Sequence, residues 1–261
     1  MTHQARAGVC VTVACAVAMT LGGCGDSGTD RAAPGATKSA SGITSRTAST
    51  SASAPASGSA PASGSAATGE GKGSGREVLP GLPSAAEARQ ALGKLAVAAP
   101  RPMSGYSRAA FPHWAQQGNK CDTRETVLGR DGQGVKRDAE CRAVSGAWHS
   151  FYDDKTFTAA SQVDIDHIVP LANAWRSGAD TWTNDKRKAF ANDLSHPQLL
   201  TVSAATNRSK GDQSPDQWQP PAKSAWCVYG RAWTSVKSTY GLTVTEEERK
   251  MLTTMLGTCT A

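Results

Sequence analysis

Residues 77–261 show two spacings of apolar positions, one typical of helices and one typical of strands. From Lys223 to Tyr240 the large apolar side chains are spaced by three and four positions, as on one face of an α-helix. A second helix is predicted beyond Gly241, where Thr245 precedes three glutamates in the pattern of a capping box. The two helices should run antiparallel, with the glycine at the turn between them.

Two short strands and a helix are predicted in the middle of this region. Residues 163–169 alternate and are rich in β-branched side chains, and Pro170 stops the strand. Residues 199–202 form the second strand. A short helix follows, because Ser203 is a favourable N-cap and Gly211 a favourable C-terminal stop. The order strand, strand, helix brings side chains from three elements toward one place.

A further short helix is predicted between residues 78 and 99. Ser84 lies three positions ahead of Glu87, and Pro100 ends the pattern. The folded domain is expected to begin there.

The first 76 residues differ in composition from the rest. Residues 1–24 combine a basic start with a 12-residue apolar run that is too short to span a bilayer, which predicts an export signal. The run ends in Leu-Gly-Gly-Cys, which resembles a bacterial lipobox, so Cys24 is expected to carry lipid. The alternative is ordinary secretory cleavage.

Residues 25–76 are predicted to be a flexible linker. Of these 52 residues, 43 are Gly, Ser, Ala, Thr or Pro, and such a tract cannot bury enough apolar surface to fold. It lowers the overall hydrophobic share to 39%, but residues 77–261 hold all seven Trp and are expected to form a globular domain. The net charge of +6 falls to +3 in that domain, which permits an anionic partner without arguing for one.

Four cysteines lie in residues 77–261. An even number in an exported domain argues for disulfides, and three connectivities are possible. Proximity favours Cys121–Cys141 and Cys227–Cys259, the second because its cysteines lie at adjoining ends of the two predicted antiparallel helices. A four-cysteine metal site is the rival interpretation, but the sequence has no C-x-x-C pair.

Three polar side chains of different chemistry lie on the predicted strand, strand, helix unit. These are the carboxylate of Asp166, the imidazole of His167 and the amide of Asn207. Strict alternation places Asp166 and His167 on opposite faces of a strand. They can therefore act together only if the strand bends or ends there, which the nearby Pro170 makes plausible.

The sequence Asp-His-Ile-Val-Pro at 166–170, followed by Asn-Arg-Ser-Lys-Gly-Asp at 207–212, resembles the HNH endonucleases, whose ββα-metal module holds one divalent cation. From about Tyr106 to Cys259 the chain is similar to exported proteins with the GmrSD restriction-endonuclease C-terminal-type domain. Five motifs carry this resemblance: Cys121-Asp122-Thr123-Arg124, Asp164-Ile165-Asp166-His167, Pro170-Leu171-Ala172-Asn173-Ala174-Trp175, Phe190-Ala191-Asn192-Asp193-Leu194 and Trp218-Gln219-Pro220-Pro221. The resemblance implies an α+β fold, with a ββα-metal (HNH) nuclease core embedded in a mainly helical, disulfide-stapled domain.

The resemblance also implies a division of roles. His167 would be the general base that deprotonates water, while Asp166 and Asn207 would supply oxygen ligands to one divalent metal ion. Such hard oxygen donors suit Mg²⁺ or Mn²⁺ better than Zn²⁺. Zinc-type members carry a His-x3-His helix, whereas Gly211 stands four residues after Asn207 here.

Gln198 departs from the pattern of this branch. It lies nine residues before Asn207, where the branch usually has an Asn whose side chain orients the base by a hydrogen bond to the backbone. Gln has the same amide on one more methylene. Activity could therefore be retained, or the base could be held loosely.

Other side chains are candidates for supporting roles, each with a structural alternative. Lys210 and Arg124 are expected to bind the scissile phosphate, or else to be surface cations. Arg208 would be a general phosphate contact or have no role, Asp164 either orients the base or faces solvent, and Trp218 is a candidate lid over the site.

The sequence therefore predicts an exported, metal-dependent endonuclease. Its partner would be nucleic acid, DNA before RNA, with the membrane contacted only through lipid on Cys24 and no obligate protein partner. One alternative is a surface-anchored nucleic-acid-binding module whose HNH site is weakened or inactive. The other is a hydrolase of a different extracellular phosphodiester.

Overall fold

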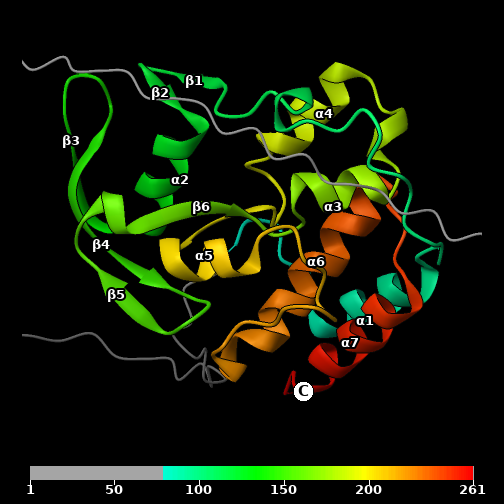
Figure 1. Ribbon diagram of the computed structural model, residues 1–261. Coiled ribbons are helices and arrows are strands. Elements are labelled where there is room, and N and C mark those ends of the chain that lie inside the picture. Colours follow the sequence, from blue (N-terminus) through cyan, green and yellow to red (C-terminus); the bar gives the residue numbers. More distant parts are fainter. Residues whose placement is uncertain (1–78, 261) are drawn as a thin grey trace, which may run out of the picture. The chain divides into compact units, whose positions relative to one another are not determined.

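The computed structural model describes residues 79–260, which form a mixed α+β fold (Figure 1). This part of the chain contains seven α-helices and three small antiparallel sheets. None of its helices is both long and apolar enough to cross a membrane. The export signal, Cys24, the linker and the boundary at residue 77 lie outside the described residues and stay predictions.

Three helices from the two ends of the described region pack together (Figure 1). They are α1 (Ala85–Lys94), α6 (Trp226–Tyr240) and α7 (Glu246–Gly257). Capping boxes begin α1 at Ser84 and α7 at Thr245, as the sequence predicted. Local hydrogen bonds of the first turn therefore fix where these helices start.

The predicted strand, strand, helix unit is present (Figure 1). Strands β6 (Val163–His167) and β7 (Leu199–Ser203) pair antiparallel, with Asp166 opposite Leu200. Helix α5 (Ala204–Lys210) begins directly after β7 and ends at Gly211, whose φ of 56° lies in the left-handed region that glycine adopts without strain.

Two further sheets correct the expectation of mainly helical surroundings. One pairs β3 (Gln133–Arg137), β4 (Ala143–Ser150) and β5 (Lys155–Phe157), and the other is a hairpin of β1 (Gln116–Gly118) and β2 (Cys121–Asp122). These strands bury few side chains, so their sequences carry little of the alternation by which a strand is recognised.

Shorter helices connect these units. The remaining α-helices are α2 (Thr123–Asp131), α3 (Leu171–Arg176) and α4 (Asn184–Ala191). Single 3₁₀ turns span Arg108–Ala110, Ala160–Gln162, Ala179–Thr181 and Lys223–Ala225. Helix α3 follows β6 after only three residues, which fixes the direction in which the chain leaves that strand.

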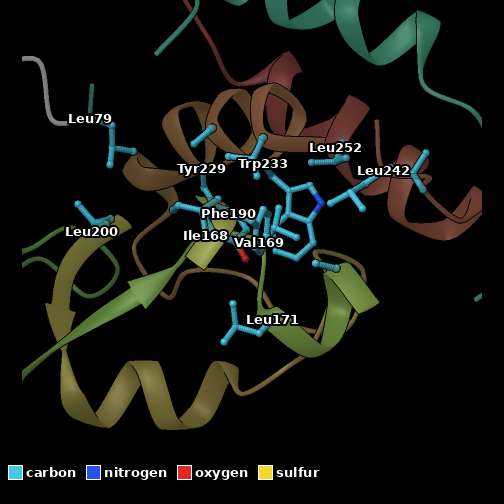
Figure 2. Close-up of a cluster of buried hydrophobic side chains, with 14 of the residues drawn as sticks. Leu79, Ile168, Val169, Leu171, Phe190, Leu200, Tyr229, Trp233, Leu242 and Leu252 are labelled. Carbon is cyan, nitrogen blue, oxygen red and sulfur yellow. The ribbon is translucent and has the colours of Figure 1, made fainter. Parts of the chain in front are cut away.

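The β6–β7 pair lies between two groups of buried apolar side chains. The larger group gathers around Trp233 and Tyr229 of α6 and includes Leu200 of β7 (Figure 2). The smaller group includes Leu199 of β7 and Ile165 of β6. Because neighbouring residues of β7 point to opposite faces, both faces are buried, which explains the nearly continuous apolar run of that strand.

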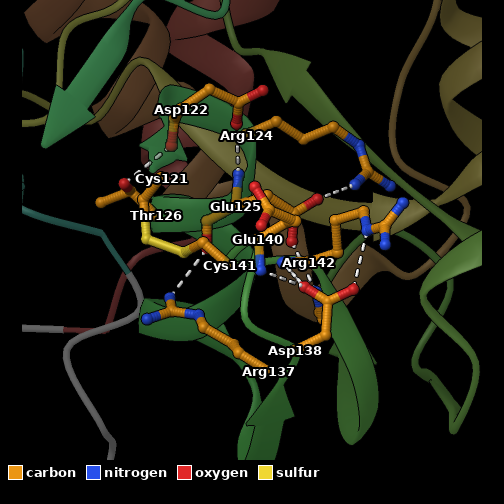
Figure 3. Close-up of a disulfide and its surroundings, with 11 residues drawn as sticks. Cys121, Asp122, Arg124, Glu125, Thr126, Arg137, Asp138, Glu140, Cys141 and Arg142 are labelled. Atoms are coloured by element: carbon orange, nitrogen blue, oxygen red, sulfur yellow. Dashed lines mark hydrogen bonds and ion pairs between the residues drawn. A yellow bond between two sulfur atoms is a disulfide. The ribbon is translucent and has the colours of Figure 1, made fainter. Parts of the chain in front are cut away.

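The structure contains both predicted disulfides. Cys227–Cys259 joins the start of α6 to the end of α7, with the Cα atoms 4.9 Å apart. Cys121–Cys141 joins β2, directly before α2, to the turn between β3 and β4, with the Cα atoms 5.2 Å apart (Figure 3). The Cys121–Cys141 bridge therefore connects the β3–β4–β5 sheet to the segment that leads into α2, which packs against that sheet.

Reduction should destabilise the domain. The bridges close loops of 20 and 32 residues. On the chain-entropy model each loop contributes about 3–4 kcal/mol to the free energy of unfolding. We expect dithiothreitol to lower the melting temperature. The Cys227→Ser/Cys259→Ser variant should show part of this decrease before any reductant is added. An unchanged midpoint under full reduction would contradict this expectation.

Candidate functional site

Strand β6 ends in two residues with chemical function. Asp166 and His167 are its last two residues, and Asn207 lies on α5. All three line one cavity of about 410 Å³. Both Asp166 and His167 remain paired in the β6–β7 ladder, opposite Leu200 and Leu199, so the strand ends directly after them and does not bend between them. The structure thus brings the predicted carboxylate, imidazole and amide to one cavity.

The carboxylate of Asp166 is buried and already holds protein donors. The ammonium of Lys210 lies 2.7 and 3.0 Å from its two oxygens, and the hydroxyl of Tyr152 donates to Oδ2 at 2.5 Å. Lys210 also donates to the carbonyl oxygen of His167 at 2.8 Å. Burial raises the pKa of Asp166 and lowers the pKa of Lys210, and their mutual attraction opposes both shifts.

This position corrects the expected role of Lys210. Its side chain is 0% exposed and cannot reach a phosphate at the surface of the site. Helical spacing placed Lys210 on a face neighbouring that of Asn207, but it did not show that Asp166 would lie beneath that face. The side chain is an internal counter-ion that connects α5 to the end of β6.

His167 is held in one tautomer. Its Nε2 lies 2.9 Å from the carbonyl oxygen of Ala191, which can only accept, so Nε2 carries the hydrogen and Nδ1 is the free acceptor of the neutral ring. The residue is 4% exposed, and this burial lowers the pKa of His167 to about 3. The ring is therefore neutral at physiological pH.

An aromatic ring covers His167 on one side. The ring of Trp114 lies with its centroid 5.7 Å from that of the imidazole. Trp114 has a φ of 58°, a left-handed conformation that is uncommon for a bulky residue.

Gln198 fixes the backbone just beyond His167. Its Oε1 accepts from the amide of Val169 at 3.1 Å and its Nε2 donates to the carbonyl of the same residue at 3.0 Å. The side chain is fully buried. The longer Gln amide thus makes a two-point backbone contact of the kind expected at this position.

Asn207 is oriented by Asp164. The Asn207 amide donates from Nδ2 to Asp164 Oδ2 at 3.2 Å, which leaves Asn207 Oδ1 as the acceptor. Asp164 therefore contacts Asn207, and not His167 as one expectation had it. Arg208 is exposed and also lines the cavity.

Two other expected contributors lie elsewhere. Arg124 bonds to Glu125 at 2.5 Å and does not line the cavity, because it lies at the start of α2 beside its own acidic neighbour. Trp218 is no lid: it packs against Tyr152 and Tyr229 in the core. Its Pro-rich neighbourhood suggested a surface turn, but the indole is buried within the aromatic cluster.

One family model matches about half of the chain. The family described as GmrSD restriction endonucleases, C-terminal domain, matches residues 123–255. The chain belongs to this family. An "Uncharacterized secreted protein" of Arthroderma benhamiae (strain ATCC MYA-4681 / CBS 112371) is 54% identical over 180 residues, which is 69% of this chain and 88% of the relative. No solved structure matches the chain.

Membership of the GmrSD C-terminal domain family indicates a nuclease-like role. The secreted relative and the two disulfides together indicate export. Neither bears on the lipid predicted at Cys24.

Three residues of this GmrSD-type site escaped the sequence analysis. Tyr106 and Arg108 line the cavity from a loop about 60 residues before β6, and Tyr152 donates to Asp166 from the turn after β4. Nothing in their spacing links them to the strand, strand, helix unit. The five family motifs pass over Arg108, so no sequence signal could have found it.

The donor set of the site fits a hard cation that is completed by water. No group of three or more His, Cys, Asp or Glu side chains within residues 79–260 is arranged to hold a metal. Asp166 and Asn207 would supply one carboxylate and one amide oxygen, and both residues line the cavity. Mg²⁺ commonly binds through one or two carboxylates while it keeps several waters. The ammonium of Lys210 competes for the same carboxylate, which favours weak binding.

Proposed function

We propose that this protein is an exported, metal-dependent endonuclease that hydrolyses phosphodiester bonds of nucleic acid. One observation carries the proposal: a neutral imidazole with its acceptor nitrogen free, a carboxylate and an amide oxygen share one cavity in a member of the GmrSD C-terminal domain family. Strands β6 and β7 with α5 would be its ββα-metal core. Lipid on Cys24 would hold the protein at the membrane, and ordinary cleavage would release it.

In this proposal His167 is the general base. Its Nδ1 accepts the proton of the attacking water, while the bond from Nε2 to Ala191 and the Gln198 contact with Val169 hold the ring and the backbone in place. A pKa of about 3 makes the ring a weak base when the cavity is empty. The negative charge of a bound phosphate would raise that pKa and favour proton transfer.

Asp166 and Asn207 would hold the divalent cation. When bound, the cation supplies Lewis-acid stabilisation of the charge that develops on the phosphate and the leaving oxygen. Asp164 orients the Asn207 amide for this role through the bond to Nδ2. The ammonium of Lys210 opposes the rise in the pKa of Asp166 that burial causes, and it connects this carboxylate to the His167 backbone.

Because Lys210 is buried, two exposed arginines are the proposed phosphate contacts instead. Arg108 and Arg208 both line the cavity, and a guanidinium can bind phosphate oxygens in a bidentate manner. We expect Arg108→Ala and Arg208→Ala each to raise KM for DNA by about tenfold or more, as loss of a hydrogen bond to a charged group worth about 1.5 kcal/mol does. Arg142→Ala, at an exposed arginine of the β3–β4 turn, is the matched control and should leave KM unchanged. Equal effects of all three would indicate a general charge effect only.

The proposal is tested by cleavage of supercoiled plasmid DNA and, separately, of RNA. The purified protein is incubated with Mg²⁺, Mn²⁺, Zn²⁺ or EDTA. We expect cleavage with Mg²⁺ or Mn²⁺ and none with EDTA. Cleavage that persists in EDTA would contradict metal dependence.

The same assay separates the two alternative functions. Intact substrate that is retained on a filter in EDTA would support a binding module and overturn the proposed activity. Hydrolysis of bis(p-nitrophenyl) phosphate without cleavage of DNA or RNA would point to another phosphodiester.

A further inference from the structure

Asn192 connects two of the five family motifs. It belongs to the motif at residues 190–194, and its side chain lies 2.8 Å from the hydroxyl of Thr123, in the motif at residues 121–124. Asn192 does not line the candidate site. It directly follows Ala191, however, whose carbonyl accepts the hydrogen bond from the imidazole of the proposed general base. The contacts of Asn192 therefore bear on how that carbonyl is placed.

The side-chain amide of Asn192 joins three segments of the chain. Its Nδ2 donates to the carbonyl of Lys188 in α4 at 2.8 Å and to the carbonyl of Pro112 at 2.7 Å. Its Oδ1 accepts from the backbone amide of Ala115 at 2.8 Å and lies 2.8 Å from the hydroxyl of Thr123 at the start of α2. Both N–H donors and the oxygen of this amide are thus engaged.

One of these bonds completes the end of α4. The last four carbonyls of an α-helix have no partner within the helix, and the Asn192 side chain supplies one to Lys188. The backbone N–H of Asn192 donates to the carbonyl of Ala189 at 3.3 Å. Ala191, the last residue of the helix, is buried, and its carbonyl lies 2.9 Å from Nε2 of His167. The turn that Asn192 forms therefore sets the direction of this carbonyl.

The other bonds hold the segment that carries Trp114. Asn192 binds the carbonyl of Pro112 and the amide of Ala115, which lie on either side of Trp114 in the chain. The ring of Trp114 packs against the imidazole of His167, with the centroids 5.7 Å apart and the planes 32° apart. Asn192 thus also fixes the backbone of the residue whose ring covers the imidazole.

We propose that Asn192 positions the general base of this site. It acts through two groups that contact His167, the carbonyl of Ala191 and the ring of Trp114. This role rests on the proposed function, in which Nδ1 of His167 faces the attacking water. A carbonyl can only accept, so its place selects the tautomer with the hydrogen on Nε2. Because a displacement of about 1 Å can cost about 10²-fold in rate, a side chain outside the cavity can control the reaction.

Asn192→Ala tests this positioning without metal or nucleic acid. The variant removes the bonds to Lys188, Pro112 and Ala115. The readout is the pair of ¹⁵N NMR shifts of the His167 imidazole at neutral pH, assigned with His167→Ala. In the wild type we expect one nitrogen with a hydrogen and one without. In the variant the two shifts should move toward each other, because the carbonyl no longer holds one tautomer.

The second readout is single-turnover cleavage of plasmid DNA with Mg²⁺ or Mn²⁺ over a range of protein concentrations. We expect Asn192→Ala to lower the rate at saturation by about 10–10²-fold. The protein concentration that gives half of this rate should stay unchanged, since Asn192 does not line the cavity. A smaller folded fraction alone would not lower the rate at saturation.

Asn173→Ala is the matched control. Asn173 is buried, and its Oδ1 accepts from Lys237 at 2.7 Å and from Ser177 at 3.2 Å, bonds that involve none of the groups that contact His167. This control should lower the melting temperature and keep both the wild-type rate and the His167 shifts. Asn192→Asp is a second test that retains the size of the side chain and its acceptor oxygen but loses both donors. It should change the shifts and the rate in the same direction as Asn192→Ala.

Three results would overturn the inference. They are wild-type His167 shifts in both Asn192 variants, an unchanged rate at saturation in Asn192→Ala, and an equal loss of rate in Asn173→Ala. With an active wild type, each of these results overturns this inference alone. A wild type that cleaves no nucleic acid overturns the proposed function, and the shifts then still decide whether Asn192 fixes the imidazole.

Discussion

His167→Ala is expected to lower the rate of metal-dependent DNA cleavage by about 10²–10⁴-fold, the contribution of a positioned general base. The variant removes Nδ1, the proposed acceptor of the water proton. The variant loses one hydrogen bond to the Ala191 carbonyl, worth about 1 kcal/mol, and the packing of one buried ring against Trp114, and the fold should persist. The measurement is single-turnover cleavage of plasmid DNA with Mg²⁺ or Mn²⁺, accompanied by thermal melting.

His149→Ala is the matched control for this prediction. His149 is exposed on β4 and does not line the candidate site. We expect its cleavage rate to equal that of the wild type. If His167→Ala were equally active, the proposed mechanism would be wrong. Retained folding with lost activity would separate the chemical role of His167 from a structural one.

Lys210→Met is expected to lower the free energy of unfolding by about 3–5 kcal/mol at neutral pH. The variant leaves the carboxylate of Asp166 buried with the hydroxyl of Tyr152 as its remaining side-chain donor. It also removes the donor to the His167 carbonyl. Urea denaturation measures the loss.

The pH dependence of this loss has a definite sign. Burial raises the pKa of Asp166, and removal of Lys210 takes away the main effect that opposes the rise. A carboxyl whose folded pKa lies above its unfolded value of about 3.9 keeps its full stability below that value and loses it as the pH rises through the folded pKa. The difference between wild type and Lys210→Met should therefore shrink as the pH is lowered toward 4. A difference that grows on acidification would contradict the assignment.

Two further variants control for the loss of a buried lysine. Lys237→Met removes the other lysine of residues 79–260 that is fully buried, whose ammonium lies 3.2 Å from Glu248. This variant should destabilise by a similar amount without changing DNA cleavage. Lys210→Met combined with Asp166→Leu should recover most of the stability, because a buried ion pair can often be replaced by apolar residues. If the stability does not recover, the Lys210–Asp166 pair must stabilise the fold by more than the neutralisation of its own two charges.

The local sequence determines much of the helical part of this fold. Ser84 and Thr245 begin α1 and α7 through hydrogen bonds within a single turn, and Ser203 and Gly211 bound α5 in the same way. Such contacts involve residues at most a few positions apart, so they can be predicted without knowledge of the tertiary structure. The disulfide of α6 and α7 follows because two antiparallel helices must bring adjoining ends together.

Contacts between distant segments could not be predicted in this way. Strands β3 and β5 bury few side chains, so the pattern that reveals a strand is weak there, and pairing with β4 decides their structure. Arg108 reaches the site from a loop that no motif marks.

The sequence by itself determined which chemical groups this protein brings to its site, a carboxylate, an imidazole and amides, since their spacing places them on two strands and a helix. Only the tertiary structure decided how each is used. Lys210 shows the reason. A lysine on a short helix can equally face solvent or the interior. Lys210 faces the interior because its ammonium pairs with the buried carboxylate of Asp166 on β6. Burial and charge pairing depend on the whole fold, so they assign roles that local spacing leaves open.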